Sequence, residues 1–195
     1  MKKYAFLFCI ALLELSFHPG QPNEYGKWQM FYGLNHDDFI QTGTEQKIDI
    51  KWADYSLNPD QRKINRQVCF YAPDSAYFLD LYSNSFELNQ EADGSLSRKE
   101  TLKGSKAQLI NTQGFSATAL LDLGKDGFVE TAFWRGQSWF VICGFTRSEK
   151  GEFVPTTWWY DLTKKTYTVF HNTKVFPVLA KSYTRDVKLM NFKQK

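Results

Sequence analysis

The sequence lacks the patterns by which several large functional classes are recognised. Its 24 lysines and arginines are interspersed with 21 acidic residues and form no basic block, which argues against nucleic acid as a partner. Its three histidines lack metal-ligand spacing, and no glycine-rich loop leads into a helix to hold a phosphate. A Gly-x-Ser-x-Gly nucleophile motif is also missing. We therefore expect no nucleic acid, no metal and no cofactor, and the sequence leans away from an enzyme.

Long apolar runs are missing as well, and the one short run lies at the N-terminus. Residues 1–3 carry two lysines ahead of the apolar residues 4–13, and Glu14 then interrupts the run. A membrane-spanning helix needs about 20 apolar residues. We therefore interpret residues 1–20 as a secretory signal peptide. The remaining residues, 21–195, are expected in the periplasm or outside the cell, with no transmembrane segment after the leader.

Cysteine is scarce. Once the leader with Cys9 is removed, Cys69 and Cys143 remain, and an even number in an oxidising compartment makes a disulfide chemically possible. A bridge requires Cα atoms within about 7 Å, which a sequence does not show. Both cysteines lie in apolar, strand-like contexts, and these favour buried free thiols. A disulfide between Cys69 and Cys143 stays as the alternative.

Helical periodicity is missing from every stretch of a dozen residues after the leader, whereas strand-length runs separated by turn residues recur. Aromatic residues make up 17% of the chain, which favours β structure. We predict one all-β domain of mainly antiparallel, meandering sheets with roughly ten strands. The expected strands are 27–32, 47–52, 68–71, 76–82, 106–110, 115–121, 129–134, 139–145, 153–162, 166–171, 175–179 and 187–192, with a partly hairpin-like excursion at 84–103.

The middle of the chain repeats itself weakly. Residues 71–80 align with 133–142, since each stretch has an aromatic residue, a turn and then an aromatic-rich strand. Further on, 107–111 align with 157–161, and both are followed by a short polar turn and another strand. Repeats of this kind indicate one structural unit used twice. The common unit is expected to contain three or four strands.

Two short motifs of this repeat carry a resemblance to a known architecture. The turn Ala-Pro-Asp-Ser at 72–75 and the stretch Tyr-Asp-Leu-Thr-Lys-Lys at 160–165 resemble blades of β-propellers of the WD40-like or PD40 type. The resemblance implies two blade-like units, near 68–123 and 129–171, in an incomplete propeller or a compact sandwich. The chain is also similar in general character to small exported bacterial proteins, a similarity that implies no function.

Carboxylates support acid–base chemistry when two of them share a cleft. His36, Asp37 and Asp38 are adjacent and follow an expected strand, a position typical of a solvated turn. Asp80 lies on an otherwise apolar expected strand, so it is either half-buried and hydrogen-bonded or exposed at a functional face. The structural role is the favoured one. A hydrolase acting at the cell envelope would use Asp80 or Asp37 as its carboxylate.

Aromatic residues are the one clear excess in the second repeat. Trp158 and Trp159 are adjacent in an expected strand and must therefore face opposite sides of the sheet. An exposed tryptophan beside tyrosine or arginine is typical of surfaces that bind proteins, peptides or sugars. Packing inside a sheet covered on both faces explains the same residues. The candidates for ligand binding are Trp134, Arg135, Trp158, Tyr160 and Asp80.

These observations together favour an exported, non-catalytic binding or interaction module. Its partner would be a protein, a peptide or a glycan, and its oligomeric state is left open. Two alternatives remain. One is an envelope-associated hydrolase with a carboxylate pair, and the other is a structural subunit that completes a sheet with a partner chain.

Overall fold

The computed structural model describes residues 23–55, 64, 67–101 and 103–195. The predicted signal peptide, residues 1–20, lies outside the described residues. Helical elements are α2 (Glu24–Tyr32), the 3-10 helix η2 (His36–Asp38) and the π-helix η3 (Thr184–Lys188). The strands are β1 (Phe39–Lys47), β2 (Ala53–Asp54), β3 (Phe70–Tyr71), β4 (Tyr77–Asp80), β5 (Phe86–Gln90), β6 (Leu96–Glu100), β7 (Ser105–Asn111), β8 (Ser116–Gly124), β9 (Gly127–Trp134), β10 (Trp139–Arg147), β11 (Phe153–Asp161), β12 (Thr166–Asn172) and β13 (Phe192–Gln194).

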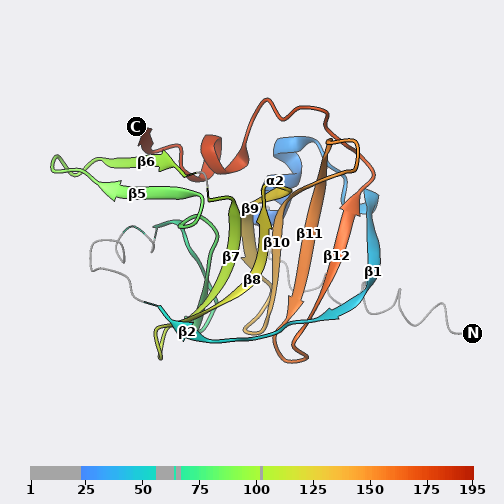
Figure 1. Cartoon of the computed structure of the whole chain (residues 1–195), viewed down its shortest axis with the longest axis horizontal. Coiled ribbons are helices and arrows are strands. Elements are labelled where there is room, and N and C mark those ends of the chain that lie inside the picture. The colour runs from blue at the N-terminus through green and yellow to red at the C-terminus, as the bar shows by residue number, and fades with distance from the viewer. Residues whose placement is uncertain (1–22, 56–63, 65–66, 102) are drawn as a thin grey trace, which may run out of the picture.

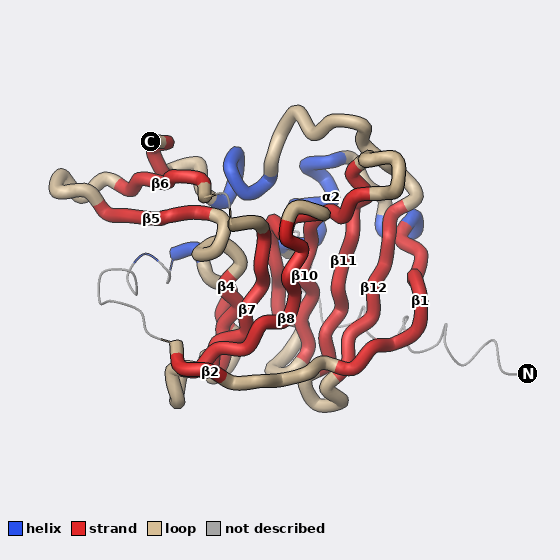
Figure 2. The backbone as a smooth tube through the Cα atoms, in the orientation of Figure 1, coloured by secondary structure: helices blue, strands red, loops and turns tan. Residues whose placement is uncertain are grey.

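Three sheets contain these strands (Figure 1). The first sheet has the order β1-β12-β11-β10-β9, and the second has the order β2-β8-β7-β4-β3. The third, which we call the arm, has the order β13-β6-β5 and projects from the body of the molecule (Figure 2). Every pairing is antiparallel except the parallel pair of β13 and β6. The predicted all-β fold of mainly antiparallel sheets is confirmed.

Each of the two repeated segments forms an antiparallel meander. In the first sheet β9, β10, β11 and β12 are neighbours in chain order. In the second sheet β3, β4, β7 and β8 are likewise neighbours in chain order, and the β5–β6 hairpin leaves the sheet between β4 and β7. The N-terminal strands then complete the sheets, because β1 pairs with β12 and β2 pairs with β8. This arrangement places residues 48–52 across one end of both sheets (Figure 1).

The main hydrophobic core lies between the two five-stranded sheets. Alternate residues of β10, Phe140 and Ile142, meet Leu79 and Leu109 from the second sheet in one buried cluster. The opposite face of β10, with Val141, Cys143 and Phe145, packs under α2 and the chain near Tyr183 in a second cluster. Strand β10 is therefore buried on both faces, and its near-continuous apolar run is typical of such a strand.

Trp158 and Trp159 divide between the same two clusters. Trp158 belongs to the core between the sheets, and Trp159 packs against the cluster under α2. The predicted opposite orientation of the two rings is thus confirmed.

The segment 27–32 was predicted as a strand, and this prediction is wrong because the segment belongs to helix α2. Tyr25, Trp28 and Tyr32 recur at helical spacing and are buried together against the first sheet. The Asn23 side chain accepts a hydrogen bond from the Gly26 amide (2.8 Å) and so caps the helix N-terminus. Gly33 ends the helix with a φ of 62°, which is the left-handed conformation typical of a C-cap.

Three further strand predictions fail at the sheet edges. The segment 47–52 is not a strand, because β1 ends at Lys47 and the chain then crosses towards β2. The segment 175–179 contributes only one bridge, between Phe176 and Phe153. The segment 187–192 was expected to be a strand, whereas η3 occupies its beginning and β13 starts only at its last residue. Several apolar side chains of these segments face solvent instead of a sheet, since Trp52 is 42% exposed, Val178 75% and Met190 67%.

Candidate functional site

The aromatic residues predicted to bind a ligand lie mostly inside the molecule. Trp158 and Tyr160 are 3% and 0% exposed, and the Tyr160 hydroxyl donates to the Leu120 carbonyl (3.2 Å). Trp134 is half-buried and its indole N–H donates to the Phe70 carbonyl (2.8 Å), which ties the first sheet to the second. All three rings pack in the core between the sheets, and Trp158 and Tyr160 offer no face to solvent.

Arg135 lies in the turn after β9. Its guanidinium carbon is 5.1 Å from the centroid of the Trp159 ring, a cation–π geometry.

Exposed aromatic rings lie at the same end of the strands, where β2, β8 and β10 begin: Trp52 (42% exposed), Phe115 (48%) and Trp139 (39%). Trp52 stacks on Tyr77 with ring centroids 6.3 Å apart. We call this surface the aromatic end.

Asp80 is 4% exposed at the end of β4 and organises the turn that follows. Its carboxylate accepts hydrogen bonds from the backbone amides of Tyr82 and Ser83 (3.0 Å each) and from the Tyr55 hydroxyl (3.1 Å). The Ser83 hydroxyl donates to the same carboxylate. Four donors around one buried carboxylate give Asp80 a structural role.

The acidic pair near the N-terminus is arranged differently. Asp37 and Asp38 belong to η2 and are exposed, whereas the His36 ring lies 3.0 Å from the Tyr25 hydroxyl. Within the described part of the chain, no three side chains of His, Cys, Asp or Glu are grouped so that they could hold a metal ion.

Both cysteines are free thiols in this structure, so the alternative of a disulfide between them is not realised. Cys143 is buried under α2, and Cys69 packs against a separate small cluster on the second sheet. Burial raises the pKa of both thiols, and the nearby Asp80 carboxylate adds to the effect at Cys69. Neither sulfur is therefore poised as a nucleophile.

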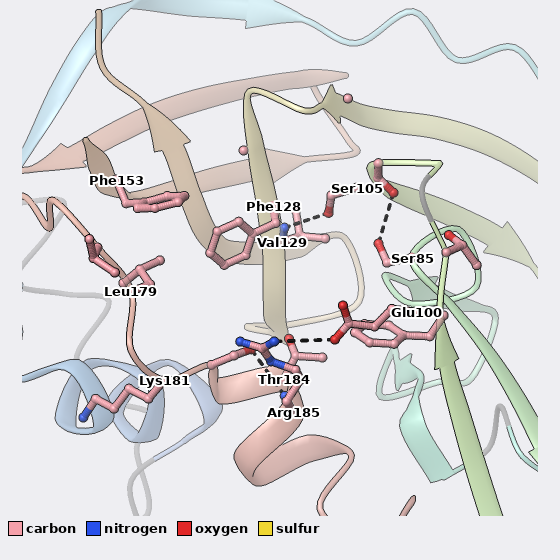
Figure 3. A pocket seen from close by; sticks show the side chains of 17 residues that line it. Ser85, Glu100, Ser105, Phe128, Val129, Phe153, Leu179, Lys181, Thr184 and Arg185 are labelled. Atoms are coloured by element: carbon pink, nitrogen blue, oxygen red, sulfur yellow. Dashed lines mark hydrogen bonds and ion pairs between the residues drawn. The ribbon is translucent and has the colours of Figure 1, made fainter. Parts of the chain in front are cut away.

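A cleft of about 500 Å³ lies at the opposite end of β9 from the aromatic end (Figure 3). Its walls come from the beginnings of β9 and β11, from the base of the arm and from the C-terminal segment, by which we mean residues 174–189. The apolar part of the lining consists of Phe86, Phe128, Val129, Phe153, Val178 and Leu179. Val178 is 75% exposed, so an apolar side chain stands in water at the rim.

The polar groups of the cleft come from the base of the arm and from the C-terminal segment. The Ser105 hydroxyl oxygen accepts a hydrogen bond from the Val129 amide (2.9 Å), and the Ser85 hydroxyl donates to the Gly104 carbonyl (3.2 Å). Glu100 and Arg185 face each other across the opening and form an ion pair of 3.5 Å (Figure 3). Both side chains of this pair are about half exposed, so the pair is loosely held.

Behind one wall of the cleft lies Glu130, which is fully buried. It sits where β9 has a register irregularity opposite Cys143 and Gly144. Its two carboxylate oxygens accept hydrogen bonds from the Trp28 indole N–H (3.0 Å), the Tyr32 hydroxyl (3.0 Å) and the Ser182 hydroxyl (2.9 Å). Helix α2, strand β9 and the C-terminal segment therefore meet at one carboxylate.

Burial raises the pKa of Glu130 above its ordinary value, although the hydrogen bonds from Tyr32, Trp28 and Ser182 act in the opposite direction. No cation contacts this carboxylate among the described residues. Glu130 is a connecting group, and it positions the Ser182 side of the cleft wall.

Lysines from the C-terminal segment hold α2 at both of its ends. Lys188 pairs with Glu24 in the first turn (2.9 Å), and Lys174 donates to the Gly33 carbonyl just beyond the last turn (3.1 Å). The Lys181 ammonium group donates to the Phe31 carbonyl, so its side chain points away from the cleft and towards α2 (Figure 3). A positive charge at a helix C-terminus and a negative charge in the first turn are both favourable.

Sequence reasoning missed Glu130 and the cleft. The signal for Glu130 was present, because a single acidic residue interrupts the apolar run of β9 just as Asp80 interrupts that of β4. A charge inside such a run must find hydrogen-bond partners if the strand is buried. The cleft had no comparable signal, since its walls come from segments far apart in the sequence.

Comparison of the chain with protein-family models, with curated proteins and with solved structures finds no match. Within the described residues, no helix combines the length and the apolar character needed to cross a membrane.

Proposed function

We propose that this protein is an exported, non-catalytic binding protein whose ligand occupies the cleft beside the C-terminal segment. The observation that carries the proposal is a cleft of about 500 Å³ whose exposed lining surface is mostly apolar and also carries hydroxyl and charged groups. Ligand sites of small molecules typically have such a volume and such a lining. The resemblance of the two meanders to propeller blades and the export of the chain are parts of the same proposal.

The rival functions have less support. An envelope hydrolase requires an accessible carboxylate pair, whereas Asp80 is enclosed by its four donors. A subunit that completes a sheet requires an exposed apolar edge strand. In the first sheet the edge strand β1 is polar apart from Phe39 and Ile40 and has an irregular register after Thr42, whereas the apolar edge strand β9 is mostly buried. The aromatic end remains a second surface on which a protein, peptide or glycan partner could bind.

The proposal is tested with the neutral fluorescent probe N-phenyl-1-naphthylamine, titrated into the purified full chain. Val178→Asp puts a charge on the rim of the cleft without disturbing the core, and we expect it to weaken probe binding about tenfold, since contact with an apolar ligand is lost. Val175→Asp is the matched control, because Val175 lies in the same segment but not in the cleft lining.

The proposal fails if the unchanged protein does not bind the probe or if both valine variants weaken binding equally. Loss of binding in Trp139→Ala, with Val178→Asp unaffected, would instead place the binding site at the aromatic end.

A further inference from the structure

We propose that the ligand of the cleft is an apolar chain that ends in a carboxylate, and that Arg185 anchors this carboxylate. The inference rests on the proposed binding function of the cleft and adds the chemical class of the ligand. It depends on which donors at the opening are free, on the charges around them and on the apolar lining.

Four hydroxyl groups of the cleft already donate hydrogen bonds. Ser85 donates to the Gly104 carbonyl, Thr101 to the Asn84 carbonyl, and Ser182 and Thr184 to the side chain and the backbone carbonyl of Glu130. The fifth, Ser105, accepts from the Val129 amide and is only 4% exposed. A ligand that used these hydroxyls as donors would have to break hydrogen bonds that hold the cleft walls together. The hydroxyls are therefore poor anchors for a polar head group.

The guanidinium group of Arg185 has spare capacity. Across the described residues, its one side-chain interaction is the ion pair with Glu100, at 3.5 Å. A guanidinium group presents several N–H donors in a fork that binds a carboxylate through two parallel hydrogen bonds. Because Glu100 is about half exposed, its carboxylate can turn into water when a ligand carboxylate takes its place.

The surrounding charges favour an anion over a cation. Arg98 supports the turn that carries Arg185, since its guanidinium group donates to the backbone carbonyls of Arg185 (2.9 Å) and Leu189 (3.0 Å). The acidic group on this turn, Asp186, accepts a hydrogen bond from the Ser182 amide (2.9 Å) and is engaged there. A cationic head group would have to pair with Glu100 beside the Arg185 guanidinium group, which opposes its binding.

The number of charges also selects among anions. One loosely paired guanidinium group balances a single negative charge, which is what a carboxylate carries. A phosphate monoester would bring nearly two negative charges at neutral pH. The apolar remainder of the ligand would lie along Phe128, Phe153 and Leu179, which line the cleft beyond the ion pair.

The test uses four ligands with twelve-carbon chains: dodecanoate, 1-dodecanol, dodecyl phosphate and dodecyltrimethylammonium. Calorimetry on the full-length protein measures the binding of each ligand below its micelle concentration. We expect dodecanoate to bind most tightly. Arg185→Gln should weaken dodecanoate binding about fivefold, a modest factor because the side chain is half exposed. Glu100→Gln should strengthen dodecanoate binding, since it removes the competing carboxylate. Arg135→Gln, with the same charge change at the aromatic end, should leave dodecanoate binding unchanged.

The outcomes separate the inference from the function on which it rests. If none of the four ligands binds, the proposed function fails and the inference fails with it. If all four bind equally and Arg185→Gln has no effect, the cleft binds apolar chains but the carboxylate anchor is wrong. Tighter binding of the ammonium or the phosphate ligand would also overturn the inference, as would weaker dodecanoate binding in Glu100→Gln.

Discussion

Replacing Glu130 tests whether one buried carboxylate holds α2, β9 and the C-terminal segment together. In Glu130→Ala the indole N–H of Trp28, a residue with no exposed surface, loses its acceptor. An unsatisfied buried donor costs about 2 kcal/mol, and the void left by the shortened side chain adds about 1 kcal/mol. The Tyr32 hydroxyl can turn to the Lys181 carbonyl, which is already 3.4 Å away, and Ser182 can turn to water in the cleft. We therefore expect a loss of about 3 kcal/mol in the free energy of unfolding.

Glu130→Gln is the matched control, because the amide can satisfy the same network. With its oxygen towards the Trp28 indole, its NH₂ group can donate to the hydroxyl oxygens of Tyr32 and Ser182. We expect this variant to lie within about 1 kcal/mol of the unchanged protein at neutral pH. Urea unfolding followed by tryptophan fluorescence measures both values, and the alanine variant should melt about 9 °C lower.

The pH dependence gives an independent check. Burial raises the pKa of Glu130 in the folded protein above its ordinary value of 4.5, so the folded state binds this proton more tightly than the unfolded state does. Its contribution to stability is complete below pH 4.5 and is lost as the pH rises through the folded pKa. The stability of the unchanged protein relative to Glu130→Gln should therefore fall as the pH rises. This account would be refuted if the unchanged protein became more stable relative to Glu130→Gln as the pH rose. It would also be refuted if the glutamine variant were as unstable as the alanine variant.

Two further predictions concern the packing of the first sheet and the attachment of α2. Gly144→Ala should lower the free energy of unfolding by about 3 kcal/mol, because a Cβ atom there would lie 2.1 Å from the Phe128 carbonyl oxygen. Gly136→Ala is the control: its Cβ atom would meet nothing within 4 Å, so this variant should be nearly neutral in the same urea titration. Burial acts to raise the pKa of Glu24, but Lys188 and Lys27 together outweigh it and hold the pKa below its ordinary value. Lys188→Met should therefore lower the free energy of unfolding by about 1 kcal/mol at neutral pH, and this loss should shrink as acid protonates Glu24. A loss that stays constant from pH 7 to pH 3 would contradict the ion-pair explanation.

Local chemistry made the hairpins predictable. The turn at 72–75 joins β3 to β4, and Asp93 and Gly94 lie in the turn between β5 and β6, as the turn residues indicated. The near-continuous apolar run of β10 is likewise typical of a strand buried on both faces. These features depend on neighbours in the chain, so the sequence pattern carries them.

The candidate site was far less predictable. Arg185, Val178 and Phe153 become neighbours only when the C-terminal segment folds back over the first sheet. The aromatic excess led to Trp158 and Tyr160, yet the same ring surface that binds ligands also fills cores. Which of the two roles a ring plays depends on what covers it, and the sequence pattern does not specify that.

The sequence by itself determined most strands of the two meanders and their hairpins, because period-two alternation and turn chemistry act between residues close along the chain. It did not indicate strand β1. Only the tertiary structure decided that 24–32 is a helix, because the first sheet offers an apolar face on which Tyr25, Trp28 and Tyr32 can be buried together. It also decided that Glu130 connects three segments, since a buried carboxylate acquires its meaning from donors that lie far away in the sequence.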